Sequence, residues 1–153
     1  MRVHPAVEAL GFLLGTWSGT GRGRYPTVAP FAYREEVAFS HAGRPFLSYR
    51  QETFAEDDGR PLHAEVGYLR CAGRAVELVV AQPTGLVEVD EGTLEGTTLS
   101  LSSRLVGRTS SAKAVDQVRR TVRVDGDVLT YRLEMAAVGH RLGLHLEAEL
   151  RRA

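Results

Sequence analysis

Short runs of alternating apolar and polar residues, divided by tight-turn pairs, fill the chain from Thr16 onward and constrain its fold most strongly. Such alternation is typical of strands with one buried face, and turn pairs between two runs are typical of antiparallel hairpins. No crossover helix separates the runs, which disfavours a parallel α/β sheet. We expect strands at 16–25, 31–40, 45–54, 62–71, 74–82, 85–91, 93–96, 98–106, 117–124, 127–136 and 141–150. The turn signals are Asp58-Gly59, Ala72-Gly73, Glu91-Gly92, Glu95-Gly96 and Asp125-Gly126-Asp127.

One helical signal precedes the strands. Apolar residues recur at helical spacing after Pro5, and Gly15 ends the pattern; they are Val7, Leu10, Leu13 and Leu14. This predicts a short amphipathic helix. The strands that follow, about ten in number, predict a meander that closes into a barrel, because an open sheet would leave exposed edges. A closed barrel of this size is wider than its side chains easily fill, so we expect a ligand cavity.

Length and composition agree with one globular domain spanning residues 1–153. Hydrophobic residues make up 43% and charged residues 25%, which disfavours a disordered or transmembrane chain. The formal net charge is zero, so no overall field attracts nucleic acid or an anionic membrane, and we expect neither as a partner. Cys71 is the only cysteine, and the N-terminus lacks a secretory pattern. These features predict a cytoplasmic protein.

Three glycines alternate in the first predicted strand. Alternation places Gly19, Gly21 and Gly23 on one face, together with Trp17 and Tyr25, and we expect this face to point inward. Glycines weaken a strand unless a ligand or another backbone approaches closely, or the strand bends at a barrel corner. Both explanations stay open. A phosphate loop is excluded, because no helix follows this GxGxG.

Two further strands carry candidate cavity residues. In the strand from residue 31, four residues share a face and form an aromatic wall of a kind that is usually core: Phe31, Tyr33, Val37 and Phe39. His63 alternates with Glu65 and Gly67, so it faces either a cavity or solvent, and its charged neighbour favours solvent.

His145 lies in the last predicted strand, between Leu144 and Leu146. A neutral imidazole flanked by apolar residues suits an axial haem ligand or a general base. Alternation, however, places His145 on the same face as Glu147 and Glu149, which favours solvent. A β-bulge would reverse that orientation.

Signatures of other enzyme classes are absent from the sequence. It contains no GxSxG, no HExxH and no second cysteine for a thiolate cluster. Basic residues do not interleave with aromatic residues in an RNA-binding pattern. Glu35 and Glu36 are adjacent and therefore point to opposite faces of a strand, which does not suit an acid/base pair.

Several blocks of the sequence, read together, resemble the nitrobindins, a family of haem-binding β-barrels. They occur in the family's order between residues 11 and 150: GTWSGTGRGRYPTV, HAGRPFLSYRQETF, PLHAEVGYLR, AQPTGLVEV, SSAKAV, and MAAVG followed by HL. The resemblance implies an all-β, ten-stranded antiparallel β-barrel related in shape to fatty-acid-binding proteins. It also implies one b-type haem per chain near the open end.

The same resemblance implies the site residues. His145 holds the position of the histidine in the family's terminal HL pattern and would be the proximal iron ligand. Lys113 of SSAKAV would lie near a haem edge. The approach to the last strand departs from the family's proline-containing turn, so His140 is the competing iron ligand. The implied pocket residues are Thr27, Val28, Phe31, Leu62, His63 and Met135.

By resemblance, the function is that of a ferric haem protein that binds nitric oxide and isomerises peroxynitrite to nitrate. The implied pocket is chiefly apolar and offers no evident donor to bound dioxygen, so we expect the iron to oxidise in air. Three alternatives stay open. The barrel could carry a fatty acid or another apolar ligand with an inward set such as Arg50, Arg132 and Tyr131. It could be a nitric oxide sensor or carrier without enzymatic activity, or a filled interaction module.

Overall fold

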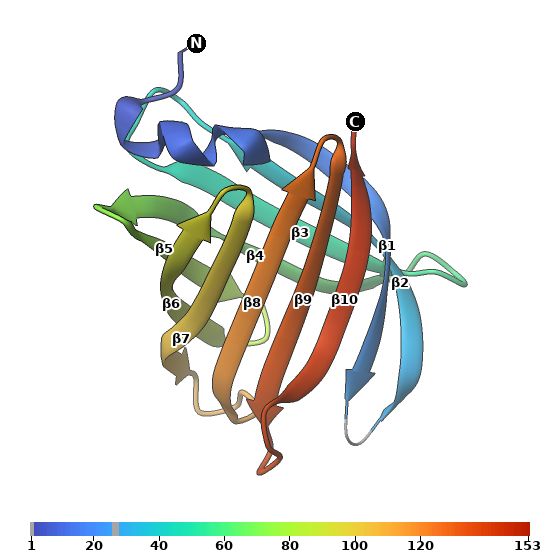
Figure 1. Cartoon of the computed structure of the whole chain (residues 1–153). Helices are drawn as coiled ribbons and strands as arrows, with labels where there is room; N and C mark the ends of the chain where they lie inside the picture. The colour runs from blue at the N-terminus through green and yellow to red at the C-terminus, as the bar shows by residue number, and fades with distance from the viewer. Residues whose placement is uncertain (1, 26–27) are drawn as a thin grey trace.

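A computed structural model describes residues 2–25 and 28–153 of the chain. Ten strands form a closed barrel in which each strand pairs antiparallel with its neighbours in sequence, and β10 closes the barrel against β1 (Figure 1). This confirms the expected all-β meander. The strands are β1 (Gly15–Tyr25), β2 (Val28–Ser40), β3 (Leu47–Ala55), β4 (Pro61–Ala72), β5 (Ala75–Gln82), β6 (Leu86–Glu95), β7 (Thr98–Arg108), β8 (Val115–Asp125), β9 (Val128–Ala137) and β10 (Gly143–Arg152).

One predicted turn is wrong. The runs 85–91 and 93–96 form the single strand β6, with Gly92 paired to Leu101 of β7. A Cβ at Gly92 would overlap the Ser100 carbonyl, so this glycine serves a close backbone approach within the sheet. The other turn signals lie between strands, with positive φ at Gly59, Gly73, Gly96 and Gly126.

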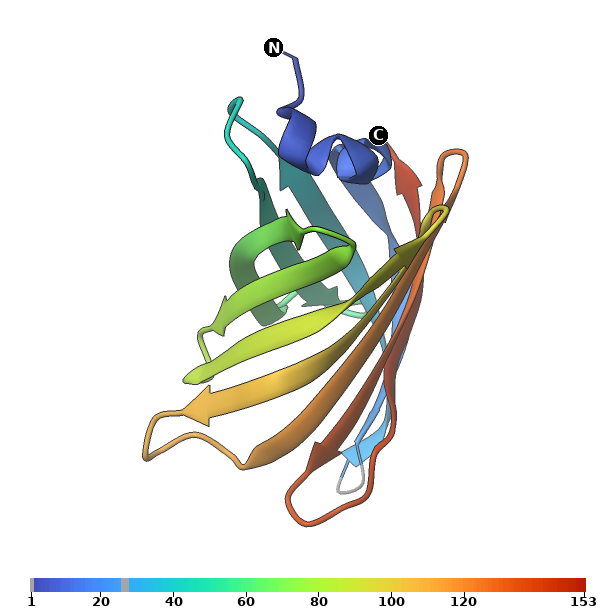
Figure 2. The same cartoon turned by 60° about the vertical axis from the view of Figure 1, so that its left-hand side comes forward.

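The N-terminal helix, η1 (Pro5–Leu13), covers one end of the barrel (Figures 1 and 2). It is a 3₁₀ helix with a kink at Val7, and the spacing of three residues places Leu10 and Leu13 on one face; Val7, Leu10 and Leu13 are all fully buried. The Trp17 indole on β1 donates a hydrogen bond to the Leu13 carbonyl over 2.8 Å. The helix and the barrel thus share one hydrophobic core. Within residues 2–25 and 28–153, no helix is long and apolar enough to cross a membrane.

The glycine face of β1 points inward, as alternation predicts. Gly21 pairs with Tyr33 of β2 and Gly23 pairs with Phe31. A Cβ at either glycine would overlap the ring of its partner. The glycines therefore let two β2 aromatic rings lie against the β1 backbone, which is a close approach of side chains from the neighbouring strand.

Candidate functional site

A cavity of about 300 Å³ lies inside the barrel. Phe31 and Leu62, which are 36% and 41% exposed, line its outer part, and the fully buried Tyr33 lines its inner part. The expected cavity is therefore present. Its other lining residues are Glu35, Val37, Phe39, Tyr49, Gln51, Thr53, His63, Glu65, Gln82, Leu86, Glu88, Val106, Val115, Val118, Arg120, Val122, Leu129, Tyr131, Leu133, Met135, His145 and Leu146.

A β-bulge in β10 turns His145 into the cavity. Leu144 pairs with Glu134 and Leu146 pairs with Leu133, so His145 is an extra residue on its strand. Both His145 and Leu146 consequently line the cavity. The solvent-facing orientation predicted by strict alternation is wrong, because the extra residue shifts the period by one.

The backbone of β1 sets the protonation state of His145. Its Nδ1 lies 2.5 Å from the Arg24 carbonyl oxygen, an acceptor, so Nδ1 carries the proton and donates. Burial lowers the pKa of His145, although the bond to Arg24 opposes that effect. The ring is therefore neutral at pH 7, with its Nε2 lone pair available. A neutral imidazole whose second nitrogen is anchored fits axial ligation of a haem iron.

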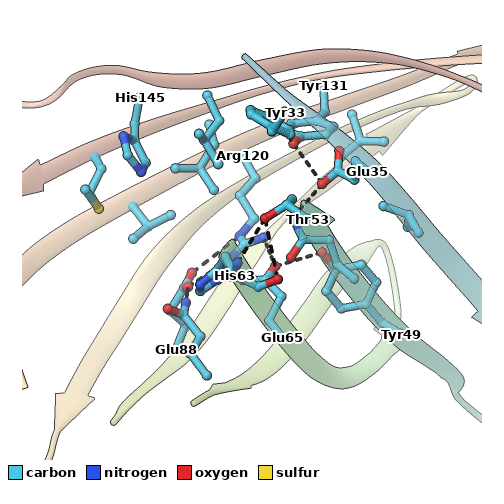
Figure 3. Close-up of a pocket in the computed structure, with 18 of the residues that line it drawn as sticks. Tyr33, Glu35, Tyr49, Thr53, His63, Glu65, Glu88, Arg120, Tyr131 and His145 are labelled. Carbon is cyan, nitrogen blue, oxygen red and sulfur yellow. Dashed lines mark hydrogen bonds and ion pairs between the residues drawn. The ribbon is translucent and has the colours of Figure 1, made fainter. Parts of the chain in front are cut away.

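His63 also points into the cavity, from β4 (Figure 3). Its Nε2 lies 3.3 Å from the Glu65 Oε2, and Glu65 is buried. The solvent-facing orientation favoured by the charged neighbour is thus wrong, since that neighbour is itself inward. The charge of His63 contributes to the lowered pKa of His145, which places the two histidines within electrostatic reach of each other.

Most of the other pocket residues implied by the resemblance gather at the same end. Phe31, Leu62 and Met135 line the cavity. Val28 lies outside it, in an adjoining surface depression that Phe31 and Leu62 also border. Thr27 falls outside the described residues.

The two remaining candidates differ in their placement. Lys113, in the β7–β8 connection, lies with its ammonium 5.8 Å from the centroid of the Tyr25 ring. That ring packs edge-on against His145, with centroids 5.8 Å apart. Lys113 therefore contacts the ring that packs against His145, and it is not among the described residues that line the cavity. His140 is exposed in the β9–β10 turn and is not among the described lining residues.

The inner cavity holds a charged cluster that sequence reasoning missed (Figure 3). Arg120 of β8 places Nη1 2.6 Å from Glu65 Oε1 and Nη2 2.8 Å from Glu88 Oε2. Its Nε lies 3.4 Å from Asp90 Oδ2. Burial opposes ionisation of Glu65, but the charge of Arg120 holds the pKa of Glu65 well below its ordinary value. Burial and the adjacent Glu88 instead raise the pKa of Asp90.

A second polar group centres on Glu35 of β2. Gln51 Nε2 donates to Glu35 Oε2 over 2.5 Å, and the Tyr131 hydroxyl donates to the same oxygen over 2.9 Å. The hydroxyls of Tyr131 and Tyr33 lie 2.7 Å apart. Burial raises the pKa of Glu35 to about 7, although these hydrogen bonds partly oppose it. Glu36 is exposed, so the predicted opposite orientation of the two glutamates is confirmed.

Alternation contained a signal for these inward polar residues. Glu35 lies on the same face of β2 as Tyr33 and Val37, so if that face lines the barrel interior, the Glu35 carboxyl also points into the interior. The prediction that Arg50 and Arg132 point inward to bind a carboxylate is wrong, because both side chains are exposed. The inward arginine is Arg120, and its guanidinium is already paired with carboxylates, which disfavours a fatty-acid head group there.

A closed barrel with a neutral, anchored histidine at its cavity defines a class of protein suited to hold haem. The sequence comparison agrees: the family model described as the THAP4-like, heme-binding beta-barrel domain matches residues 6–152. The chain therefore belongs to this family of haem-binding β-barrels.

Relatives match the chain over nearly its full length. The peroxynitrite isomerase of Nocardia farcinica is 51% identical, covering 98% of this chain and 92% of that protein. Peroxynitrite isomerase 1 of Mycolicibacterium paratuberculosis is 50% identical, covering 98% and 96%. The crystal structure of Rv2717c from M. tuberculosis superposes with a TM-score of 0.93 at 48% identity, covering 99% of both chains.

Proposed function

We propose that this protein is a haem-dependent peroxynitrite isomerase. It holds one ferric b-type haem per chain through His145 and converts peroxynitrite to nitrate in the cytoplasm. The observation that carries the proposal is the inward His145, whose Nε2 is free because Nδ1 donates to Arg24. The names of the relatives and the haem-binding family support the same activity.

Ferric haem held by His145 would supply a Lewis-acidic iron to the substrate. The chain supplies the orientation of the ligand and the enclosure of the substrate. The Arg24 carbonyl and the edge of the Tyr25 ring fix the plane of His145. Phe31, Leu62 and Met135 line the cavity at this end with apolar surface, which limits the access of water. The same bound haem would also bind nitric oxide, a small neutral molecule.

His63 is the second imidazole that lines the cavity, and its side chain is held by Glu65. Its Nε2 faces the carboxylate oxygen Glu65 Oε2, so Nε2 donates a hydrogen bond and Nδ1 remains as an acceptor. We assign His63 a positioning role, and we expect His63→Leu to lower the rate modestly.

Replacement of the proposed iron ligand tests this function. We expect His145→Ala to lose stoichiometric haem binding or to shift the Soret band, because His63, the other imidazole that lines the cavity, has its Nε2 paired with Glu65. His140→Ala is the matched control and keeps the wild-type spectrum. The reverse pattern, loss in His140→Ala and retention in His145→Ala, contradicts the assignment.

Stopped-flow measurement of peroxynitrite decay then tests the reaction itself. Ferric protein, haem-free protein and free haem are compared at equal concentration. We expect acceleration by the ferric protein beyond both references, with nitrate as the main product. No acceleration beyond the haem-free protein would refute the enzymatic proposal and favour a nitric oxide carrier or sensor.

A further inference from the structure

Among the residues that line the cavity, two buried oxygen atoms lack hydrogen-bond partners within residues 2–25 and 28–153: Glu35 Oε1 and Gln51 Oε1. Both side chains line the cavity and each residue is 4% exposed. Glu35 Oε2 and Gln51 Nε2 are already bonded to each other. What this pair presents to the cavity is therefore two acceptors, and a complementary ligand must bring hydrogen-bond donors.

Charge narrows the class of ligand. Four carboxyl groups point inward against one arginine, and Arg120 is within ion-pair distance of three of them: Glu65, Glu88 and Asp90. Within the described part of the chain, Glu35 is the inward carboxyl without a cationic side chain in contact. A buried carboxylate without a counter-charge favours a cation as its partner.

The walls beside Glu35 suit an organic cation. The rings of Phe39 and Tyr49 lie with centroids 5.3 Å apart, and Val37 and Leu129 line the same cavity. These aromatic and aliphatic side chains form an apolar surface that accepts the alkyl substituent of such a cation. An anionic ligand would meet uncompensated carboxyl charge, and a neutral alcohol would leave that charge without a partner.

We propose that Glu35 and Gln51 form a second ligand site that binds the ammonium group of a small primary amine. Its N–H groups donate to Glu35 Oε1 and Gln51 Oε1, and its alkyl chain lies along Val37, Phe39 and Tyr49. Figure 3 shows Glu35 and His145 on different sides of the pocket, which separates this site from the proposed iron ligand. The inference goes beyond the isomerase and does not depend on it.

Calorimetric titration of the full-length chain, haem-free and haem-loaded, tests the site with n-butylammonium. n-Butanol and butanoate are the neutral and anionic controls of the same chain length. We expect one butylammonium site, with binding of butanol weaker by about tenfold or more and no binding of butanoate, since a charged hydrogen bond to a carboxylate is the stronger one. Equal affinity for butanol and butylammonium, or no binding of butylammonium to the haem-free chain, overturns the proposal.

Glu35→Gln removes the charge and keeps the shape of the side chain. We expect butylammonium affinity to fall about tenfold or more in this variant. Glu36→Gln, an exposed change at the next residue, is the matched control and keeps wild-type affinity. Unchanged affinity in Glu35→Gln refutes the site. Because the haem-free arm needs no iron, failure of the isomerase proposal in the stopped-flow experiment is distinguishable from failure here.

The wild-type chain offers a measurement that needs no variant. Butylammonium stays charged between pH 6 and pH 8, whereas ionisation of Glu35 increases across this range. We expect tighter binding at pH 8 than at pH 6, and equal binding contradicts the role of Glu35. The groups that face Glu35 keep one charge state near pH 7, either neutral or fully ionised: Tyr33, Gln51, Glu65, Arg120 and Tyr131.

Discussion

At the scale of single residues, buried polar groups in this barrel take their state from one or two neighbours. The Arg24 carbonyl selects the His145 tautomer, and Arg120 keeps Glu65 ionised against the cost of burial. Glu35 has hydrogen-bond donors but no cation in contact within the described residues, so burial raises its pKa to about 7. Similar carboxyl groups in one cavity thus differ in charge.

The raised pKa of Glu35 predicts the sign of a pH effect on stability. The folded chain holds this proton up to about pH 7, whereas the unfolded chain releases it near the ordinary value of 4.5. Between these values the native state binds more protons, so the contribution of Glu35 to the free energy of unfolding decreases as pH rises. We expect Glu35→Gln to gain stability relative to wild type between pH 5 and pH 7.5, by up to about 3 kcal/mol.

Urea unfolding of both proteins at pH 5 and pH 7.5 measures this difference. Glu36→Gln, on the outer face of the same strand, controls for loss of a carboxyl and should show no pH-dependent gain. A difference between Glu35→Gln and wild type that does not change with pH contradicts the assigned titration.

At the scale of elements, β1 and β10 position the site by departing from regular strand geometry. Glycines in β1 admit the Phe31 and Tyr33 rings of β2, and the Tyr33 hydroxyl meets that of Tyr131 on β9. The bulge in β10 turns His145 inward. β1 therefore makes room for the aromatic rings of the cavity wall, and its neighbour in the barrel, β10, supplies the proposed iron ligand.

Gly21→Val tests the contribution of the glycine face. A Cβ there overlaps the Tyr33 ring, so the ring must move and its hydrogen bond with Tyr131 must break. We expect a loss of about 1 to 3 kcal/mol in the free energy of unfolding, together with reduced haem stoichiometry. Gly11→Ala is the matched control, because beyond the adjacent residues and the helix's own backbone no described atom lies within 4 Å of its added Cβ. An unchanged melting temperature and haem stoichiometry in Gly21→Val would defeat this explanation.

At the scale of the whole molecule, the barrel separates stability from binding. η1 lies at one end of the barrel (Figure 2) and buries Val7, Leu10 and Leu13 against the strands. His145 of β10 and Met135 of β9 instead line the cavity. None of the three helix residues lines the cavity. A change in the helix core should therefore lower stability without altering the proposed haem site.

Leu10→Ala tests this separation. Leu10 is fully buried, so its truncation should cost about 2 to 5 kcal/mol in the free energy of unfolding. Under conditions where the variant is folded, we expect wild-type haem stoichiometry and an unchanged Soret band. Urea unfolding and haem titration provide the two measurements. Loss of haem binding by a fully folded Leu10→Ala protein would show that the two ends are coupled.

The sequence by itself determined the strands, their antiparallel order and the inward face of β1, because alternation and turn residues act between near neighbours. It also singled out His145, through a motif whose meaning came from resemblance. Gly92 misled the prediction, since the same residue type serves a turn and a close contact between strands.

Only the tertiary structure decided which polar groups meet. Alternation has a period of two, so the single extra residue in β10 reverses the orientation of His145. No residue type in the sequence reveals where this extra residue lies. Arg120 of β8 meets Glu65 of β4 and Glu88 of β6 inside the closed barrel. Such pairs depend on the closure of the barrel and on the registers of its strands. Residues far apart in sequence reach hydrogen-bonding distance only when every strand between them is paired in the correct register.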